Sequence, residues 1–172
     1  MQKIILVGYM AVGKTTIAQL LAEKTRFKTV DIDKLIEKKI GLTVAEIFQQ
    51  KGELFFRKIE HEIFKEISEI KENLIISTGG GTPCYANNHL LLKGENVVSI
   101  YLMASIDVIL KRLKSSKKER PLVADKSEEE LQEFIAKHLF ERSYFYNQAT
   151  FNVLIDNKSK DEIANEICGL LN

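Results

Sequence analysis

Short apolar runs of strand length alternate along the chain with stretches in which apolar residues recur every three or four positions. The runs are typical of buried strands, and the longer period is typical of amphipathic helices. This alternation predicts an α/β fold, with a central parallel sheet and helices on both of its faces. The expected strands are Ile4–Val7, Thr29–Asp31, Leu74–Ser77, Val97–Leu102 and Val153–Ile155.

The helical stretches carry their own start and stop signals. One apolar stripe runs through residues 53–70 and another through residues 131–146. A hydroxyl residue followed three positions later by glutamate marks a helix start, and a glycine just after a helix marks its end. Capping boxes are predicted at Thr43–Glu46, Ser127–Glu130 and Ser159–Glu162, and terminal glycines at Gly41 and Gly52.

Length and composition narrow the class of protein. With 172 residues, of which 45% are hydrophobic, residues 1–172 can bury a core as a single domain. No apolar run approaches the roughly 20 residues of a membrane span, so we expect a cytoplasmic protein without a membrane partner. Cys84 and Cys168 lie far apart without metal-ligand spacing, which indicates thiols in a reducing compartment. The net charge of +1 gives no footprint for nucleic acid and favours a small-molecule partner.

The segment Lys3–Thr16 (KIILVGYMAVGKTT) carries the most specific single motif in the chain. It reads as strand, loop and helix, and it matches the phosphate-loop pattern G-x-x-x-x-G-K-[ST]. In such a loop, backbone N–H groups surround phosphate oxygens, the lysine reaches the β- and γ-phosphates, and the hydroxyl ligates Mg²⁺. A glycine turn before an ordinary helix is the alternative. The phosphate loop, residues 8–16, is predicted to bind a nucleotide through Gly8, Ala11, Val12, Gly13, Lys14, Thr15 and Thr16.

Two carboxylates, Asp31 and Asp33, stand where the second predicted strand ends. Open α/β sheets bind ligands at this carboxyl edge. Asp31 could hold Mg²⁺ beside Thr15, and Asp33 could accept the proton of an acceptor hydroxyl. Capping of the next helix is the alternative, because aspartate is a favoured cap residue.

Three consecutive glycines, Gly79, Gly80 and Gly81, follow the third predicted strand. Because glycine costs backbone entropy on folding, close approach of a ligand to bare backbone is the favoured reason for them. A simple turn is the alternative.

Arginine is rare in this chain, with five arginines against 20 lysines. Its planar fork suits carboxylate and phosphate groups in a way that the point charge of lysine does not. Arg57 lies in an aromatic-rich helix start, and Arg142 lies near a helix end. Arg120 lies in the polar segment 114–126, which contains Pro121 and is predicted to be a lid over the phosphate site. Any one of these arginines could instead form a surface ion pair.

Other candidate side chains receive weaker interpretations. The rings near Arg57 are expected to be mostly core, with one or two lining an acceptor pocket; they are Phe48, Phe55 and Phe56. Arg26 is expected to be solvated. No role is assigned to the three histidines, which lack ligand spacing; they are His61, His89 and His138.

The joint pattern resembles the shikimate kinase family over nearly the whole chain. Its motifs occur in that family's order: GYMAVGKTT, DID, GELFFRKIE, STGGGTP, ERPL and ERSYFYNQA. The resemblance implies a nucleoside-monophosphate-kinase-like three-layer sandwich that uses ATP, with Mg²⁺ as cofactor, to phosphorylate the 3-hydroxyl of shikimate. It also implies an acceptor-binding region at about residues 33–60. We expect a monomer.

The resemblance further implies a role for each matching residue. The catalytic residues would be Lys14, Asp33 and Arg120. Mg²⁺ would be held by Thr15 and Asp31, and adenine would lie near Arg112. Shikimate would contact Asp33, Arg57, Gly79, Gly80, Gly81 and Arg142, with Glu60 orienting Arg57. The chain departs from the usual family pattern at Ala11, where a third loop glycine is common.

Two other classes share the phosphate loop. A gluconate kinase or a nucleoside monophosphate kinase would lack the joint set of later motifs. A GTP-binding switch needs D-x-x-G and N-K-x-D. The sequence contains no D-x-x-G, and its candidate for the second motif, Asn157–Asp161, is one residue too long.

Overall fold

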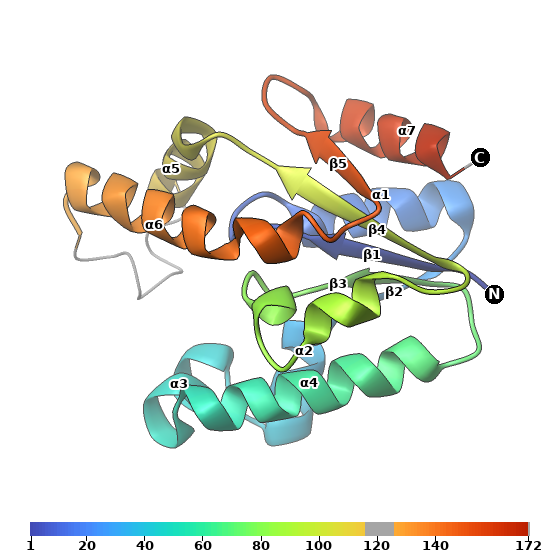
Figure 1. Ribbon diagram of the computed structural model, residues 1–172, viewed down its shortest axis with the longest axis horizontal. Coiled ribbons are helices and arrows are strands. Elements are labelled where there is room, and N and C mark those ends of the chain that lie inside the picture. The colour runs from blue at the N-terminus through green and yellow to red at the C-terminus, as the bar shows by residue number, and fades with distance from the viewer. Residues whose placement is uncertain (116–125, 172) are drawn as a thin grey trace.

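A computed structural model describes residues 1–115 and 126–171 of the chain. Its centre is a five-stranded parallel sheet in the order β2-β3-β1-β4-β5 (Figure 1). The strands are β1 (Lys3–Val7), β2 (Lys28–Asp31), β3 (Leu74–Ser77), β4 (Val97–Met103) and β5 (Phe151–Leu154). All five predicted strands are confirmed, although β5 starts and ends earlier in the sequence than predicted.

The helices and the caps that begin and end them also follow the sequence signals. The helices are α1 (Lys14–Thr25), α2 (Ile32–Ile40), α3 (Val44–Lys51), α4 (Glu53–Glu69), α5 (Ile106–Ser115), α6 (Glu128–Tyr146) and α7 (Lys160–Leu170), with short 3-10 helices η1 (Thr82–Cys84) and η2 (Asn88–Leu92). The predicted capping boxes are confirmed at the starts of α3, α6 and α7. Gly41 and Gly52 end α2 and α3 with φ of 77° and 83°, as predicted.

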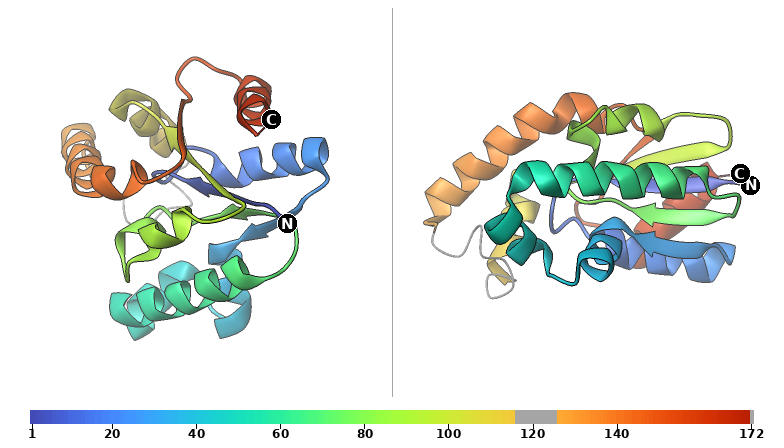
Figure 2. Two further views of the ribbon diagram at one scale, coloured as in Figure 1. Left: turned by 45° about the vertical axis from the view of Figure 1, so that its right-hand side comes forward. Right: turned by 90° about the horizontal axis from the view of Figure 1, so that it is seen from below.

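Helices cover both faces of the sheet, with α1 and α7 on one side and α2, α3 and α4 on the other (Figures 1 and 2). Side chains alternate along β1, so that Ile4 and Leu6 pack in the core cluster of α1 and α7. Ile5 and Val7 pack in the cluster of α2 and α4. Because both faces of this strand are buried, its sequence is a continuous apolar run rather than an alternating one.

The sheet topology places the site. The chain adds β2 and β3 on one side of β1 and then crosses to add β4 and β5 on the other. Ligands of open α/β sheets bind at such a switch point, outside the carboxyl ends of the strands. At this edge Ser77, the last residue of β3, is in register with Leu6 and with Asp31.

Most of the predicted lid, including its arginine, lies outside the residues that the structure describes. Of the predicted lid, residues 114–126, the structure describes Lys114 and Ser115, which end α5, and Lys126. Arg120 lies outside the described residues. Among the helices that are described, none combines the length and the apolar composition needed to cross a membrane.

Candidate active site

The phosphate loop joins β1 to α1, and backbone geometry explains why both of its glycines, Gly8 and Gly13, are glycine. Gly8 has a φ of 144°, and a Cβ there would lie 2.7 Å from the carbonyl oxygen of Leu102. Gly13 caps α1 with a left-handed φ of 97°. Residues with side chains rarely adopt such angles. The glycines therefore let the chain turn from the sheet edge into the start of α1, where backbone N–H groups can bind an anion.

Ala11 also adopts a left-handed conformation, with φ of 65°. For a residue with a Cβ this conformation costs about 1–2 kcal/mol. Arg112 on α5 contacts the same stretch, because its Nη1 donates to the carbonyl oxygens of Val12 at 2.8 Å and Ala11 at 3.3 Å. The guanidinium predicted to lie near adenine thus supports the backbone of the phosphate loop.

Lys14 is nearly buried, and its ammonium group folds back over the loop. Its Nζ donates to the carbonyl oxygens of Gly8 at 2.7 Å and Tyr9 at 2.9 Å. These two hydrogen bonds hold the ammonium group of Lys14, the first residue of α1, against the phosphate loop. This placement suits the predicted role of a charge that faces phosphate oxygens.

Thr15 and Asp31 meet at the carboxyl edge of the sheet. Thr15 Oγ1 donates to Asp31 Oδ2 at 2.8 Å and lies 3.5 Å from Ser77 Oγ. The other carboxylate oxygen, Asp31 Oδ1, accepts a hydrogen bond of 3.2 Å from the backbone N–H of Lys34 and caps α2. Asp31 therefore makes the capping contact that was its alternative interpretation and also lies beside the Thr15 hydroxyl.

Asp33 lies in the first turn of α2 and is partly buried. Burial, together with the negative charges of Glu60 and Asp31, raises the pKa of Asp33 from 3.8 to about 6, although Lys14 opposes the shift. A carboxylate whose pKa lies near the working pH can take up a proton and later release it. A pKa near 6 suits the predicted role of Asp33 as the base that accepts the proton of an acceptor hydroxyl.

Arg57 and Glu60 form an ion pair on α4. Arg57 Nη1 lies 2.8 Å from Glu60 Oε2, and Arg57 Nε lies 3.3 Å from Glu53 Oε1. Glu60 has no exposed surface. Burial of Arg57 would lower its pKa, but the carboxylate of Glu60 raises the pKa above its ordinary value. Arg57 thus keeps its positive charge, and its ion pair with the buried carboxylate of Glu60 orients the guanidinium group.

Aromatic rings surround this guanidinium. Its Cζ lies 4.1 Å from the ring centre of Tyr85, 5.2 Å from that of Phe56 and 5.8 Å from that of Phe48. Phe56 belongs to the core, whereas Phe48 is partly buried against it. Tyr85 was not predicted to lie here, because it is 28 residues from Arg57 along the chain and no local pattern links the two residues.

The glycines Gly79–Gly81 leave room for neighbouring protein groups. A Cβ on Gly79 would lie 3.0 Å from Asp33 Oδ1 and 3.0 Å from Glu60 Oε1. One on Gly81 would lie 2.6 Å from a terminal nitrogen of Arg57, and one on Gly80 would lie 3.2 Å from the amide nitrogen of Met10. Close approach to bare backbone is thus present, and the approaching groups in this structure are the site residues themselves.

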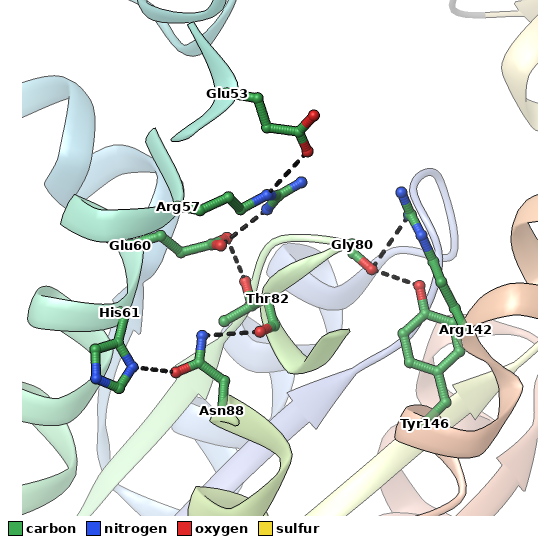
Figure 3. Close-up of polar contacts among 9 residues, drawn as sticks. All are labelled: Glu53, Arg57, Glu60, His61, Gly80, Thr82, Asn88, Arg142 and Tyr146. Atoms are coloured by element: carbon green, nitrogen blue, oxygen red, sulfur yellow. Dashed lines mark hydrogen bonds and ion pairs between the residues drawn. The ribbon is translucent and has the colours of Figure 1, made fainter. Parts of the chain in front are cut away.

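Arg142 reaches the same segment from α6. Its Nη1 lies 3.4 Å from the carbonyl oxygen of Gly80, which also accepts a hydrogen bond of 2.5 Å from the hydroxyl of Tyr146 (Figure 3). Figure 3 shows Arg57 and Arg142 approaching the triglycine segment from separate helices. The fold thus brings two arginines that are 85 residues apart in the chain to one segment of three glycines, Gly79–Gly81.

Comparison with known proteins shows the family to which the chain belongs. A family model for shikimate kinase matches residues 10–172. The shikimate kinase of Flavobacterium johnsoniae is 53% identical over 171 residues, which are 99% of each chain. That of Flavobacterium psychrophilum is 50% identical, again over 99% of each chain. The chain belongs to the shikimate kinase family.

Solved structures of shikimate kinases have the same architecture. The enzyme of Bacteroides thetaiotaomicron superposes with a TM-score of 0.91 at 34% identity, covering 99% of this chain and 98% of that one. A shikimate kinase of Acinetobacter baumannii in complex with shikimate superposes with a TM-score of 0.88 at 30% identity, over 99% and 93% of the two chains. A gluconokinase of Sinorhizobium meliloti reaches 0.61 at 14% identity, which shows only a shared fold.

Some residues near the site of this shikimate kinase family member had no sequence signal. His61, to which the sequence analysis gave no role, lies 2.7 Å from Asn88 through its Nδ1 and joins the polar contacts below Arg57 (Figure 3). Cys84 and Cys168 do not form a disulfide. Burial raises the pKa of the Cys84 thiol to about 11, which disfavours its reactive thiolate form.

Proposed function

We propose that this kinase transfers the γ-phosphoryl group of ATP to the 3-hydroxyl of shikimate, giving shikimate 3-phosphate and ADP. One observation carries the proposal: Arg57 and Arg142 both reach the triglycine segment, beside Asp33. Two guanidinium forks next to a candidate base suit a substrate that carries both a carboxylate and hydroxyl groups. The match to shikimate kinases over nearly the whole chain supports this substrate.

ATP would occupy the phosphate loop, with Lys14 facing the β- and γ-phosphates and Arg112 on the adenine side. Phosphoryl transfer needs little covalent chemistry from a protein, so positioning and charge do most of the work. Arg120 of the predicted lid would offset charge on the transferring group. Asp33 would accept the proton of the 3-hydroxyl. The hydroxyl oxygen then forms a bond to the γ-phosphorus of ATP, while the bond between that phosphorus and the leaving ADP oxygen breaks.

A magnesium ion fits the oxygen groups at the sheet edge. Mg²⁺ prefers oxygen ligands, keeps several waters, and is bound by one or two protein groups together with substrate phosphates. Thr15 and Asp31 supply a hydroxyl and a carboxylate, and Ser77 adds a second hydroxyl close by. No group of three or more His, Cys, Asp or Glu side chains with metal-binding geometry occurs among the described residues. When bound, the ion would offset negative charge on the phosphates.

The decisive experiment measures ADP release by the purified protein in the presence of Mg²⁺ and ATP. We expect release that depends on shikimate and that gluconate or AMP does not replace. Release stimulated by gluconate or AMP instead would contradict the proposal.

We further propose a monomeric enzyme of the cytoplasm, without nucleic-acid or membrane partners. The net charge of +1 supports the absence of a nucleic-acid partner. The low cysteine content supports a reducing compartment. Light scattering coupled to size-exclusion chromatography will measure the mass, which should be near 19.6 kDa.

A further inference from the structure

A chain of polar contacts links α4 to the segment after the three glycines (Figure 3). Thr82 Oγ1 donates to Glu60 Oε1 at 2.6 Å, and Asn88 Nδ2 donates to the carbonyl oxygen of Thr82 at 2.9 Å. His61 Nδ1 lies 2.7 Å from Asn88 Oδ1. The side chains of Glu60, Thr82 and Asn88 are fully buried, whereas His61 is partly exposed. This series of polar contacts therefore begins near solvent at His61 and ends at the buried carboxylate of Glu60.

The direction of each hydrogen bond follows from the donors available. A backbone carbonyl only accepts, so the atom of Asn88 that faces the Thr82 carbonyl must be the Nδ2 amide. Asn88 Oδ1 then faces His61 as an acceptor, and His61 must donate through an N–H at Nδ1. Both the neutral Nδ1–H tautomer and the imidazolium cation can make this bond.

Thr82 is held twice by adjacent residues of one helix. Glu60 contacts its side chain, and His61 contacts its backbone carbonyl through Asn88. The two oxygens of Glu60 are divided, because Oε1 accepts from Thr82 and Oε2 accepts from Arg57. The Thr82 hydroxyl thus fixes the rotation of a buried carboxylate whose other oxygen fixes the guanidinium of Arg57.

We propose that Thr82 and Asn88 are positioning residues that set the direction of the Arg57 fork and thereby the affinity for the acceptor carboxylate. This inference rests on the proposed function, in which Arg57 binds the carboxylate of shikimate. A fork makes two parallel hydrogen bonds only over a narrow range of orientations, so a small rotation of Glu60 weakens binding of the acceptor. The nucleotide site lies on the phosphate loop and does not depend on this contact.

The test compares Thr82→Val, which removes the hydroxyl, with Thr82→Ser, which retains it. We expect Thr82→Val to raise the KM for shikimate about tenfold, the scale of one hydrogen bond to a charged group, and to leave the KM for ATP within about twofold. Thr82→Ser should restore the wild-type KM for shikimate. Ser99→Ala is the matched control, because Ser99 is also fully buried and its hydroxyl donates to a carbonyl, that of Leu92, at 2.7 Å.

A purely structural role would give a different result. Thr82→Val and Ser99→Ala would then lower the melting temperature alike and leave both KM values unchanged. An unchanged KM for shikimate in folded Thr82→Val would overturn the proposal, as would an equal rise of both KM values. Should Thr82→Val not fold, His61→Leu removes the hydrogen bond to Asn88 at the partly exposed end of these contacts, and it should raise the KM for shikimate alone.

A double mutant separates this inference from the proposed function. If Thr82 acts through Arg57, Thr82→Val in an Arg57→Lys background should add less than about twofold to the KM for shikimate. Full additivity would show that Thr82 does not act through Arg57. If wild-type enzyme released no ADP in response to shikimate, the proposed function itself would be refuted. The same assay gives this result before any variant is made.

Discussion

Asp31 accepts a hydrogen bond from Thr15 through one carboxylate oxygen and caps α2 through the other. Position 31 therefore combines a contact in the proposed magnesium site with a structural contact, and a substitution there has to separate the two. Asparagine does so, because it caps helices about as well as aspartate but carries no charge.

Asp31→Asn should raise the Mg²⁺ concentration needed for half-maximal activity by about tenfold or more, the scale of losing one charged contact. Its free energy of unfolding without Mg²⁺ should stay within about 0.5 kcal/mol of wild type. The measurements are a Mg²⁺ titration of turnover and a urea denaturation curve. Ser159→Ala, which removes the cap of α7, should show the reverse behaviour, with lower stability and an unchanged Mg²⁺ requirement.

Asp33→Asn tests the candidate base. Removing the charge and proton affinity while keeping the size of the side chain should lower kcat by about 10²-fold or more. The KM for ATP should remain near that of wild type, because Asp33 is proposed to contact the acceptor and not the nucleotide. In wild type, kcat/KM for shikimate should rise with pH through a pKa of about 6, and the variant should lack this limb. Wild-type turnover in the variant would remove Asp33 from the mechanism.

The same carboxyl group makes stability depend on pH. Because its pKa is raised from 3.8 to about 6 in the folded protein, Asp33 stabilises the fold below about pH 3.8 and loses this contribution as pH rises through about 6. Asp33→Asn should therefore be more stable than wild type near pH 8, by on the order of 3 kcal/mol. Urea denaturation near pH 5 and pH 8 measures this difference, which should grow with pH; a difference that shrinks with pH would contradict the assigned pKa shift.

Arg57→Lys and Arg142→Lys test the carboxylate contact. Each should weaken shikimate binding by about 1.5–3 kcal/mol, since lysine retains the charge but not the fork. The KM for ATP should change by less than a few-fold. Lysine is preferred to alanine at position 57, because alanine would leave the buried carboxylate of Glu60 without its cation.

Shared use of one carboxylate predicts that the double variant Arg57→Lys, Arg142→Lys loses less than the sum of the single losses. Isothermal titration calorimetry with shikimate gives all three values. Arg26→Lys, at an exposed position, is the matched control and should bind shikimate as wild type does. Normal binding by both single variants would refute the contact.

Ala11→Gly tests the left-handed turn of the phosphate loop. Glycine removes the cost of the left-handed angle but adds entropy to the unfolded chain, which leaves a net stabilisation of about 0.5–1 kcal/mol. Ala22→Gly removes a Cβ from the interior of α1, where it should destabilise by about 1 kcal/mol. Thermal melting of both variants checks the opposite signs; a loss of stability in Ala11→Gly would show that the loop gains from its Cβ.

Local signals were sufficient to predict much of the fold. The phosphate loop, the capping boxes of α3, α6 and α7, and the terminal glycines depend on residues within a few positions of one another. Apolar runs also predicted β1, β3 and β4, because a strand that is buried on both faces contains mostly apolar residues. The outer strands β2 (KTVD) and β5 (FNVL) are more exposed and carry polar residues, so their apolar signal is shorter. The sequence likewise singled out Asp31, Asp33, Arg57, Arg142 and the three glycines as candidate site residues.

Only the tertiary structure decided which groups meet. Strand order sets β3 beside β1, and this brings Gly80 to the phosphate loop and Gly81 to Arg57. Neither contact leaves a pattern in neighbouring residues. His61, Thr82 and Asn88 show the same limit, because a buried polar side chain is recognised by its hydrogen-bond partners, and those partners lie up to 27 residues away. The sequence thus determined the elements and the chemical groups at their ends, whereas packing across the sheet determined the charge, direction and neighbours of each group.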